Sequence, residues 1–295
     1  MIIVIAGPTA VGKTKLSIEL AKKYNAEIIN YDSVQIYKEM DIASAKVTKE
    51  EAEGIPHHLI DIKNYDQDYS VYDYQIDARN KIKELEEKGK NIIMVGGTGL
   101  YVNSVVDGYN LTKTDPDPRT REKVLQASSE ELIEIIKESQ PEALKTLDLN
   151  NKRRLERAAE KVLNGEEIVA TNSPHYETLL IGVTWPREVL YERIRERLDK
   201  RLEEGMIDEV KKLRENGATD DFLYKLGLEY RYILMYLRGE FKDFDAFYET
   251  LFTEIRHLAK EQMTWFRKRN DIHWIDMRKD PFNEACELID KFYSE

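Results

Sequence analysis

Apolar and polar residues alternate along the first half of the chain in blocks that predict strands and helices in turn. The segment Val71–Lys88 has apolar residues at helical spacing, with Val71, Tyr74, Ile82 and Leu85 on one side, and Gly89 ends it. Uninterrupted apolar runs predict strands that are buried on both faces, as in a parallel sheet. Predominantly apolar segments of this kind are Met1–Ala6, Asn91–Val95 and Thr178–Thr184, and Ala26–Asn30 reads as a further strand. The alternation predicts an α/β fold with a doubly wound parallel sheet.

The pattern changes at Lys113. The Asp- and Pro-rich segment Thr114–Pro118 predicts a break, and charged helical sequence with no strand-like run follows to about Glu167. We therefore expect a helical insertion domain over residues 113–175 and a catalytic core made of residues 1–112 and 176–295. In the second part of the core, residues 186–215 predict a long helix broken near Gly205, and residues 272–275 predict a late strand.

The first predicted strand leads directly into the sequence GPTAVGKT and then into a helix. This is the G-x-x-x-x-G-K-[ST] loop of nucleotide- and ATP-binding proteins, in which backbone N–H groups and a helix N-terminus bind phosphate. The motif predicts a P-loop NTPase-like core and a diphosphate or triphosphate ligand, but not the reaction. Lys13 adds a full positive charge, and we expect the Thr14 hydroxyl to hold Mg²⁺. The expected phosphate-binding residues are Gly7, Pro8, Thr9, Ala10, Val11, Gly12, Lys13 and Thr14.

Two further strand ends are expected beside the phosphate-binding loop, because ligands bind at the carboxyl ends of parallel strands. One carries Asp32 and the other carries Thr98 after two glycines. Asp32 is equally consistent with a functional carboxylate and with a helix N-cap, and Thr98 with a turn residue. An ATP-hydrolysing protein usually has a strand that ends in Asp or Glu, whereas the run Ile92–Val95 ends in glycines. Kinase or ATPase activity is therefore less favoured.

Arginines recur at helical spacing in two places. One set is Lys152, Arg153, Arg154 and Arg157, and the other is Arg193, Arg197 and Arg201. Each set is consistent either with a solvated helix face that pairs with neighbouring glutamates or with a surface that binds phosphates. His57 and His58 have no further metal ligands near them in sequence, and we interpret them as structural.

Composition narrows the class of protein. The chain has 295 residues, a net charge of −11 and one cysteine, Cys286. One cysteine excludes a disulfide framework and a multi-cysteine zinc site, and predicts a cytoplasmic setting. No apolar stretch is long enough to span a membrane, and the apolar start reads as a strand rather than a signal peptide. An acidic chain can bind nucleic acid only through local basic patches, with strong salt dependence.

The motifs together resemble the tRNA dimethylallyltransferases, the tRNA isopentenyltransferases of bacteria and organelles. The resemblance covers nearly the whole chain, with departures at Ala43–Ser44, Leu228–Arg231 and Glu261. Its motifs are the phosphate loop Gly7–Thr14, Asp32-Ser33-x-Gln35-x-Tyr37, Met40–Ile42, Ala45-Lys46, Ile55–Asp61, Gly96–Tyr101, Arg154-Leu155-x-Arg157-Ala158, Arg193-Ile194-x-x-Arg197 and Ala259-Lys260-x-Gln262-x-Thr264-Trp265-Phe266-Arg267.

The resemblance implies transfer of a dimethylallyl group from dimethylallyl diphosphate to N6 of adenosine 37 in the anticodon stem-loop of tRNA. It implies Asp32 as the general base, Thr9 and Thr98 at the reacting groups, Arg197 (alone or with Arg193) on the diphosphate, and Mg²⁺ as cofactor. We further expect a monomer. The residues expected to contact tRNA are Asp32, Ser33, Val34, Gln35, Thr98, Arg119, Arg153, Arg154, Leu155, Glu156 and Arg157.

Three alternatives stay open at this point. The first is transfer of the same prenyl group to free AMP, ADP or ATP, although a small nucleotide needs no helical insertion to hold it. The second is a P-loop kinase of a nucleotide or small molecule. The third is a non-catalytic RNA-binding module, for which Lys13, Thr14 and Asp32 would have no use.

Overall fold

The computed structural model describes residues 1–113, 117–168 and 172–294, and it divides the chain into two compact units. Unit 1 comprises Met1–Val106 and Tyr176–Glu295, and unit 2 comprises Asp107–His175. Unit 2 thus begins before the expected boundary at Lys113. Its first residues lie against its last, since the Ser173 amide donates to the Gly108 carbonyl at 2.9 Å. Residues 114–116 of the predicted break lie outside the described residues.

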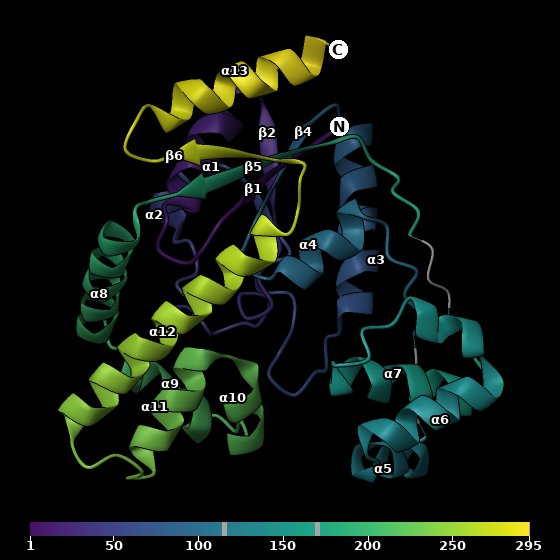
Figure 1. The fold of residues 1–295 in the computed structure, drawn as a ribbon. Coiled ribbons are helices and arrows are strands. Elements are labelled where there is room, and N and C mark those ends of the chain that lie inside the picture. The colour runs from purple at the N-terminus through teal and green to yellow at the C-terminus, as the bar shows by residue number, and fades with distance from the viewer. Residues whose placement is uncertain (114–116, 169–171, 295) are drawn as a thin grey trace. The chain divides into compact units, whose positions relative to one another are not determined.

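The centre of unit 1 is a six-stranded, fully parallel sheet (Figure 1) with strand order β3-β2-β4-β1-β5-β6. This confirms the predicted α/β fold. β2, β4 and β5 have the predicted bounds, whereas the short edge strand β3 has no sequence signal. The strands are β1 (Ile2–Ala6), β2 (Ala26–Asn30), β3 (His57–His58), β4 (Asn91–Val95), β5 (Thr178–Thr184) and β6 (Ile272–Asp276).

Successive side chains of the strands enter two different cores, because side chains alternate across a sheet. Ile3 and Ile5 pack with the helices on one face, while Ile2 and Val4 pack with those on the other. The first face is covered by α1 (Lys13–Lys23) and α13 (Pro281–Ser294), and the second by α3 (Val71–Glu87) and α4 (Gly99–Val106). The sheet is therefore doubly wound, as predicted.

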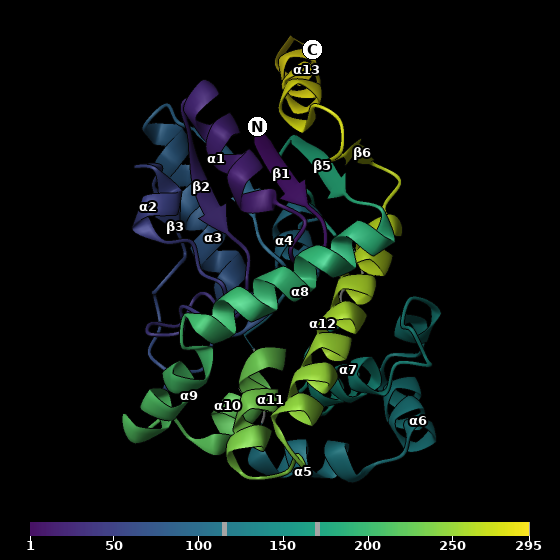
Figure 2. The ribbon, with the colours of Figure 1, turned by 90° about the vertical axis from the view of Figure 1, so that its left-hand side faces the viewer.

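A group of helices lies beyond the carboxyl ends of the strands, where the arrowheads of β1 and β2 point towards α8 (Figure 2). The predicted long helix is broken at Gly205, which has φ 96°, a left-handed conformation that favours glycine. The helices not yet introduced in this unit are α2 (Lys49–Ala52), α8 (Arg187–Glu203), α9 (Met206–Glu215), α10 (Asp220–Leu226), α11 (Leu228–Leu237) and α12 (Phe244–Arg267).

All the regular secondary structure among the described residues of unit 2 is helical. Its helices enclose a small core of its own, centred on Val124, Leu132, Ile136 and Leu155. They are α5 (Pro118–Gln126), α6 (Ser129–Ser139), a 3₁₀ turn (Pro141–Lys145) and α7 (Lys152–Leu163). Across both units, no helix among the described residues is long and apolar enough to cross a membrane.

Candidate active site

The phosphate-binding loop between β1 and α1 has its backbone carbonyls held by donors from elsewhere in unit 1. The Arg193 Nε donates to the Ala10 carbonyl at 3.0 Å, and the Trp185 Nε1 donates to the Val11 carbonyl at 3.0 Å. Gly7 must be glycine, since its φ is 149° and a Cβ there would lie 2.6 Å from the Val183 carbonyl oxygen. The Val11 side chain is fully buried, so only its backbone can serve a ligand. The Thr9 amide donates to Gln262 within the protein, whereas other backbone N–H groups of such a loop bind phosphate oxygens.

Two cations, Lys13 and Arg197, lie at this loop. The Lys13 Nζ donates to the carbonyls of Gly7 and Pro8 at 2.9 and 2.8 Å. Burial, with a smaller contribution from the Arg197 charge, lowers the Lys13 pKa to about 7. The Arg197 guanidinium donates to the Thr9 hydroxyl at 3.2 Å, and burial, then Arg201, lowers its pKa to about 10. Two cations so close together at a phosphate-binding loop suit a multiply charged anion.

Gln262 of α12 joins the phosphate-binding loop to the turn after β4. Its Oε1 accepts from the Thr9 amide at 2.8 Å, and its Nε2 donates to the Gly97 carbonyl at 3.0 Å. The sequence motif contains Gln262 but gives no sign of this role, because its two partners are 253 and 165 residues away along the chain. Gln262 therefore fixes the spacing between two walls of the site.

The ends of β2 and β4 approach each other closely enough to exclude any side chain at Gly96. A Cβ on Gly96 would lie 2.5 Å from the Tyr31 carbonyl carbon. The Tyr31 amide donates to the Val95 carbonyl at 2.9 Å, and the Thr98 amide donates to the Tyr31 carbonyl at 3.2 Å. Asp32 and Thr98 are thus brought together, as predicted from their positions after neighbouring strands.

Asp32 does not cap a helix. A loop follows it, and its Oδ1 accepts from the amides of Val34 at 2.9 Å and Gln35 at 3.4 Å. The helix-cap interpretation is therefore wrong, although the carboxylate does order its own turn. Burial raises the Asp32 pKa, while these two amides and Lys13 act in the opposite direction. A partly buried carboxylate with a raised pKa is suited to accept a proton near neutral pH.

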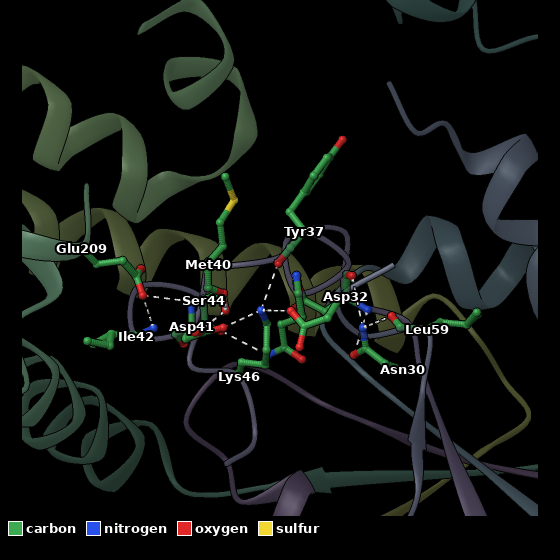
Figure 3. Close-up of polar contacts among 12 residues, drawn as sticks. Asn30, Asp32, Tyr37, Met40, Asp41, Ile42, Ser44, Lys46, Leu59 and Glu209 are labelled. Carbon is green, nitrogen blue, oxygen red and sulfur yellow. Dashed lines mark hydrogen bonds and ion pairs between the residues drawn. The ribbon is translucent and has the colours of Figure 1, made fainter. Parts of the chain in front are cut away.

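The Thr98 hydroxyl makes two hydrogen bonds with Ser33. Its Oγ1 accepts from the Ser33 amide at 3.0 Å and donates to the Ser33 hydroxyl at 3.1 Å. The Gln35 side-chain amide donates to the carbonyls of Ser44 and Ala45 at 3.1 and 3.2 Å, so its nitrogen is used within the protein (Figure 3 shows the surrounding loop). Both residues line the same cleft as Asp32.

One cleft of about 1160 Å³ is lined by Lys13, Asp32, Thr98, Arg197 and Gln262, and every residue that lines it belongs to unit 1. Its volume exceeds the roughly 300–1,000 Å³ that a pocket for one small molecule usually has. Arg193, Arg197 and Arg201 of α8 all line it, so the solvated-face interpretation is wrong for this set. The cleft has room for a second substrate beside the anion.

The residues of the cleft suit a Mg²⁺ ion that binds together with a phosphate-bearing substrate, and not a metal centre built from protein side chains alone. Thr14 is exposed and lines the cleft. The described residues contain no cluster of three His, Cys, Asp or Glu side chains placed to bind a metal ion. Mg²⁺ commonly takes one or two protein oxygens, with substrate phosphates and waters as its other ligands.

The basic residues of unit 2 divide into two groups. Arg157 and Arg121 both pair with Glu160, whose side chain is fully buried. Arg153 and Arg154 are exposed at the start of α7 and make no ion pair among the described residues; Arg119 is exposed on α5. Glu156 lies 4.0 Å from Lys152. Leu155 is fully buried in the core of unit 2. The prediction that its side chain contacts tRNA is therefore wrong, because that side chain packs in this core.

Comparison with known proteins gives full-length matches. The family described as IPP transferase matches residues 35–269. A tRNA dimethylallyltransferase of Bacillus pumilus is 43% identical and matches 98% of this chain and 92% of its own length. The tRNA dimethylallyltransferase of Carboxydothermus hydrogenoformans is 42% identical, and the match covers 98% of this chain and 96% of that protein.

Two solved structures resemble this one along its whole length. The tRNA isopentenylpyrophosphate transferase of Bacillus halodurans aligns with a TM-score of 0.74 at 37% identity, covering 99% of this chain and 98% of its own. A eukaryotic dimethylallyltransferase, described as acting on tRNA, aligns with a TM-score of 0.81 at 26% identity. The alignment covers 99% of this chain and 79% of that chain.

The lowered pKa of Lys13 predicts that anion binding takes up a proton. Above about pH 7 the Lys13 amine of the empty cleft is largely neutral, and a bound diphosphate raises its pKa and recharges it. At about pH 8.5, calorimetry of inorganic diphosphate binding in buffers of different ionisation enthalpy should register this uptake, which fades by about pH 5.5. Lys13→Arg is the matched control, because arginine stays charged throughout. Equal proton uptake in both proteins would contradict the assignment.

Proposed function

The chain belongs to the IPP transferase family, and on that premise we propose how its cleft transfers a dimethylallyl group to tRNA. The activity is that of a tRNA dimethylallyltransferase. Its acceptor is N6 of adenosine 37 of the tRNA, its donor is dimethylallyl diphosphate, and its products are N6-isopentenyladenosine in tRNA and diphosphate. The observation that carries the proposal is a single cleft that holds a cationic phosphate site and a carboxylate of raised pKa.

The donor's diphosphate binds the phosphate loop, where backbone N–H groups other than that of Thr9, together with Lys13 and Arg197, face it. As the N6–C1 bond forms, the C1–O bond of the donor breaks, and the diphosphate leaves with that electron pair. Fixed cations and backbone dipoles stabilise such a leaving group without reorganising during the reaction. When bound, Mg²⁺ would be held by the Thr14 hydroxyl and the diphosphate oxygens, and would neutralise charge there.

The acceptor occupies the Asp32 side of the cleft. An exocyclic amine is a weak nucleophile, and it must lose a proton as the new bond forms. Asp32 accepts that proton, while Thr9, Ser33, Val34 and Thr98 contact the reacting groups and the target nucleotide. A base in an anticodon loop leaves its stack more cheaply than one in a duplex, and this cleft has room for it. Unit 2 holds the stem-loop through phosphate contacts of Arg153 and Arg154, with Arg119 as a further contact.

The choice of acceptor tests the proposal directly. We expect that the protein, given dimethylallyl diphosphate with unmodified tRNA and AMP at equal concentration, modifies the tRNA adenosine almost exclusively. Mass spectrometry of the digested tRNA and of the free nucleotide pool measures both products in one sample. Prenylated AMP as the main product would favour the free-nucleotide transferase, and phosphorylation of an acceptor by ATP would favour a kinase.

Asp32→Asn should separate proton acceptance from local structure. Asparagine keeps an Oδ1 that accepts from Val34 and Gln35, so the turn and the melting temperature should survive. Without a base, the single-turnover rate should fall by at least about a hundredfold, with tRNA affinity retained. The wild-type rate should also decrease on the acid side, as Asp32 becomes protonated above the ordinary aspartate pKa. Near-normal turnover in Asp32→Asn would remove Asp32 from the mechanism.

The two groups of arginines in unit 2 should respond differently. Replacing Arg153, Arg154 and Arg157 by Ala should raise the KM for tRNA. The slope of the logarithm of tRNA affinity against the logarithm of salt concentration should also become shallower, by about one for each tRNA phosphate that is no longer neutralised. The Arg153→Ala/Arg154→Ala protein should reproduce most of this effect without loss of stability. Arg157→Ala should instead lower the melting temperature, because it removes a partner of the buried Glu160.

Donor binding serves as the control in all three proteins and should not change, because the cleft lies wholly in unit 1. If the triple variant binds tRNA as tightly as the wild type, these arginines are a solvated face and not an RNA-binding surface.

A further inference from the structure

The loop segment Asp41–Ala45 lines the cleft, and a carboxylate of helix α9 binds its backbone (Figure 3). Glu209 of α9 accepts from three consecutive amides, those of Asp41 at 2.9 Å, Ile42 at 2.6 Å and Ala43 at 3.0 Å. The Tyr230 hydroxyl donates to the same carboxylate at 3.0 Å. Successive N–H groups that converge in this way form an anion-binding nest, and here the protein itself provides the anion.

The carbonyls of the same segment are held as well. Arg201 of α8, which is 6% exposed, donates its Nε to the Ile42 carbonyl at 2.8 Å and another nitrogen to the Ala43 carbonyl. The buried Lys46 donates to the Tyr37 carbonyl at 2.9 Å and to the carboxylates of Asp41 and Asp61 at 2.6 Å. The segment is therefore held from both sides of its backbone.

This segment in turn fixes the residues around Asp32. The Ser44 and Ala45 carbonyls accept from the side chain of Gln35, and the Gln35 amide donates to the Asp32 Oδ1 at 3.4 Å. A continuous chain of hydrogen bonds thus runs from Glu209 through Asp41–Ala45 and Gln35 to Asp32. The phosphate loop, by contrast, is held by Arg193, Trp185 and Gln262, none of which bonds to Asp41–Ala45 or Glu209 among the described residues.

We propose that Glu209 is a positioning residue for the acceptor half of the cleft. It acts through the Asp41–Ala45 segment on Gln35 and Asp32, and it leaves the donor half unaffected. The inference rests on the proposed function, since it concerns the same cleft. If Glu209 is removed, three amides lose their common acceptor, and the segment is free to move. A displacement of about 1 Å at a catalytic group can lower the rate on the order of a hundredfold.

The test compares Glu209→Ala, Glu209→Gln and Glu215→Ala with the wild-type protein. Glu215 is the matched control, because it lies exposed on the same helix and its side chain makes no hydrogen bond or ion pair among the described residues. The measurements are the single-turnover rate with tRNA, the KM for tRNA and the Kd of inorganic diphosphate. Melting curves check that each protein is folded.

We expect Glu209→Ala to lower the single-turnover rate by about tenfold to a hundredfold and to raise the KM for tRNA, with the diphosphate Kd within about twofold of wild type. The rate of Glu209→Gln should lie between those of Glu209→Ala and the wild type, because its one carbonyl oxygen can still accept from two of the three amides. Glu215→Ala should match wild type.

Two results would overturn the inference: an unchanged rate in Glu209→Ala, or a parallel loss of rate and diphosphate affinity, which would indicate general damage. If Glu209→Ala does not fold, Glu209→Gln is judged by the same two criteria. A wild-type protein that transfers no prenyl group to tRNA would instead overturn the proposed function.

Discussion

The close contact between the ends of β2 and β4 determines the arrangement of the cleft. Gly96 leaves no room for a side chain against Tyr31, and the Tyr31 carbonyl accepts from Thr98. Because β4 also pairs with β1, the same contact sets the distance between Asp32 and the phosphate loop. Gln262 then joins the loop to Gly97 from the other side. The phosphate loop and Asp32, the proposed proton acceptor, are therefore positioned by one edge of the sheet.

The electrostatics of the cleft follow from that arrangement. Lys13, Arg197 and Asp32 share a partly buried space, in which burial disfavours the charged form of each. The Arg197 charge also lowers the Lys13 pKa, and the Arg201 charge lowers the Arg197 pKa, so a bound diphosphate relieves this repulsion. The Asp32 carboxylate is oriented by the Val34 and Gln35 amides, and burial raises its pKa although these amides and Lys13 act in the opposite direction. The same burial thus favours anion binding at one end and proton acceptance at the other.

The sequence predicts what depends on local pattern and misses what depends on distant contacts. The strands β4 and β5 have the predicted bounds because their residues are mostly apolar, and β2 has them although it includes Glu27 and Asn30. The phosphate loop is recognised from eight consecutive residues. Nothing near Glu209 or Gln262 in sequence indicates their partners, which come from remote segments. Leu155 reads as part of a basic motif, yet its apolar side chain belongs to the core of unit 2.

The central claim is that one cleft orients the donor between the phosphate loop and Asp32. The most direct measurement is a crystal structure with Mg²⁺ and an unreactive thiolo analogue of dimethylallyl diphosphate. We predict the two phosphates within hydrogen-bonding distance of the loop amides, Lys13 and Arg197, with the dimethylallyl carbons directed into the part of the cleft that Asp32 faces. An analogue bound outside the loop, or with its prenyl group pointing away from Asp32, would contradict the account.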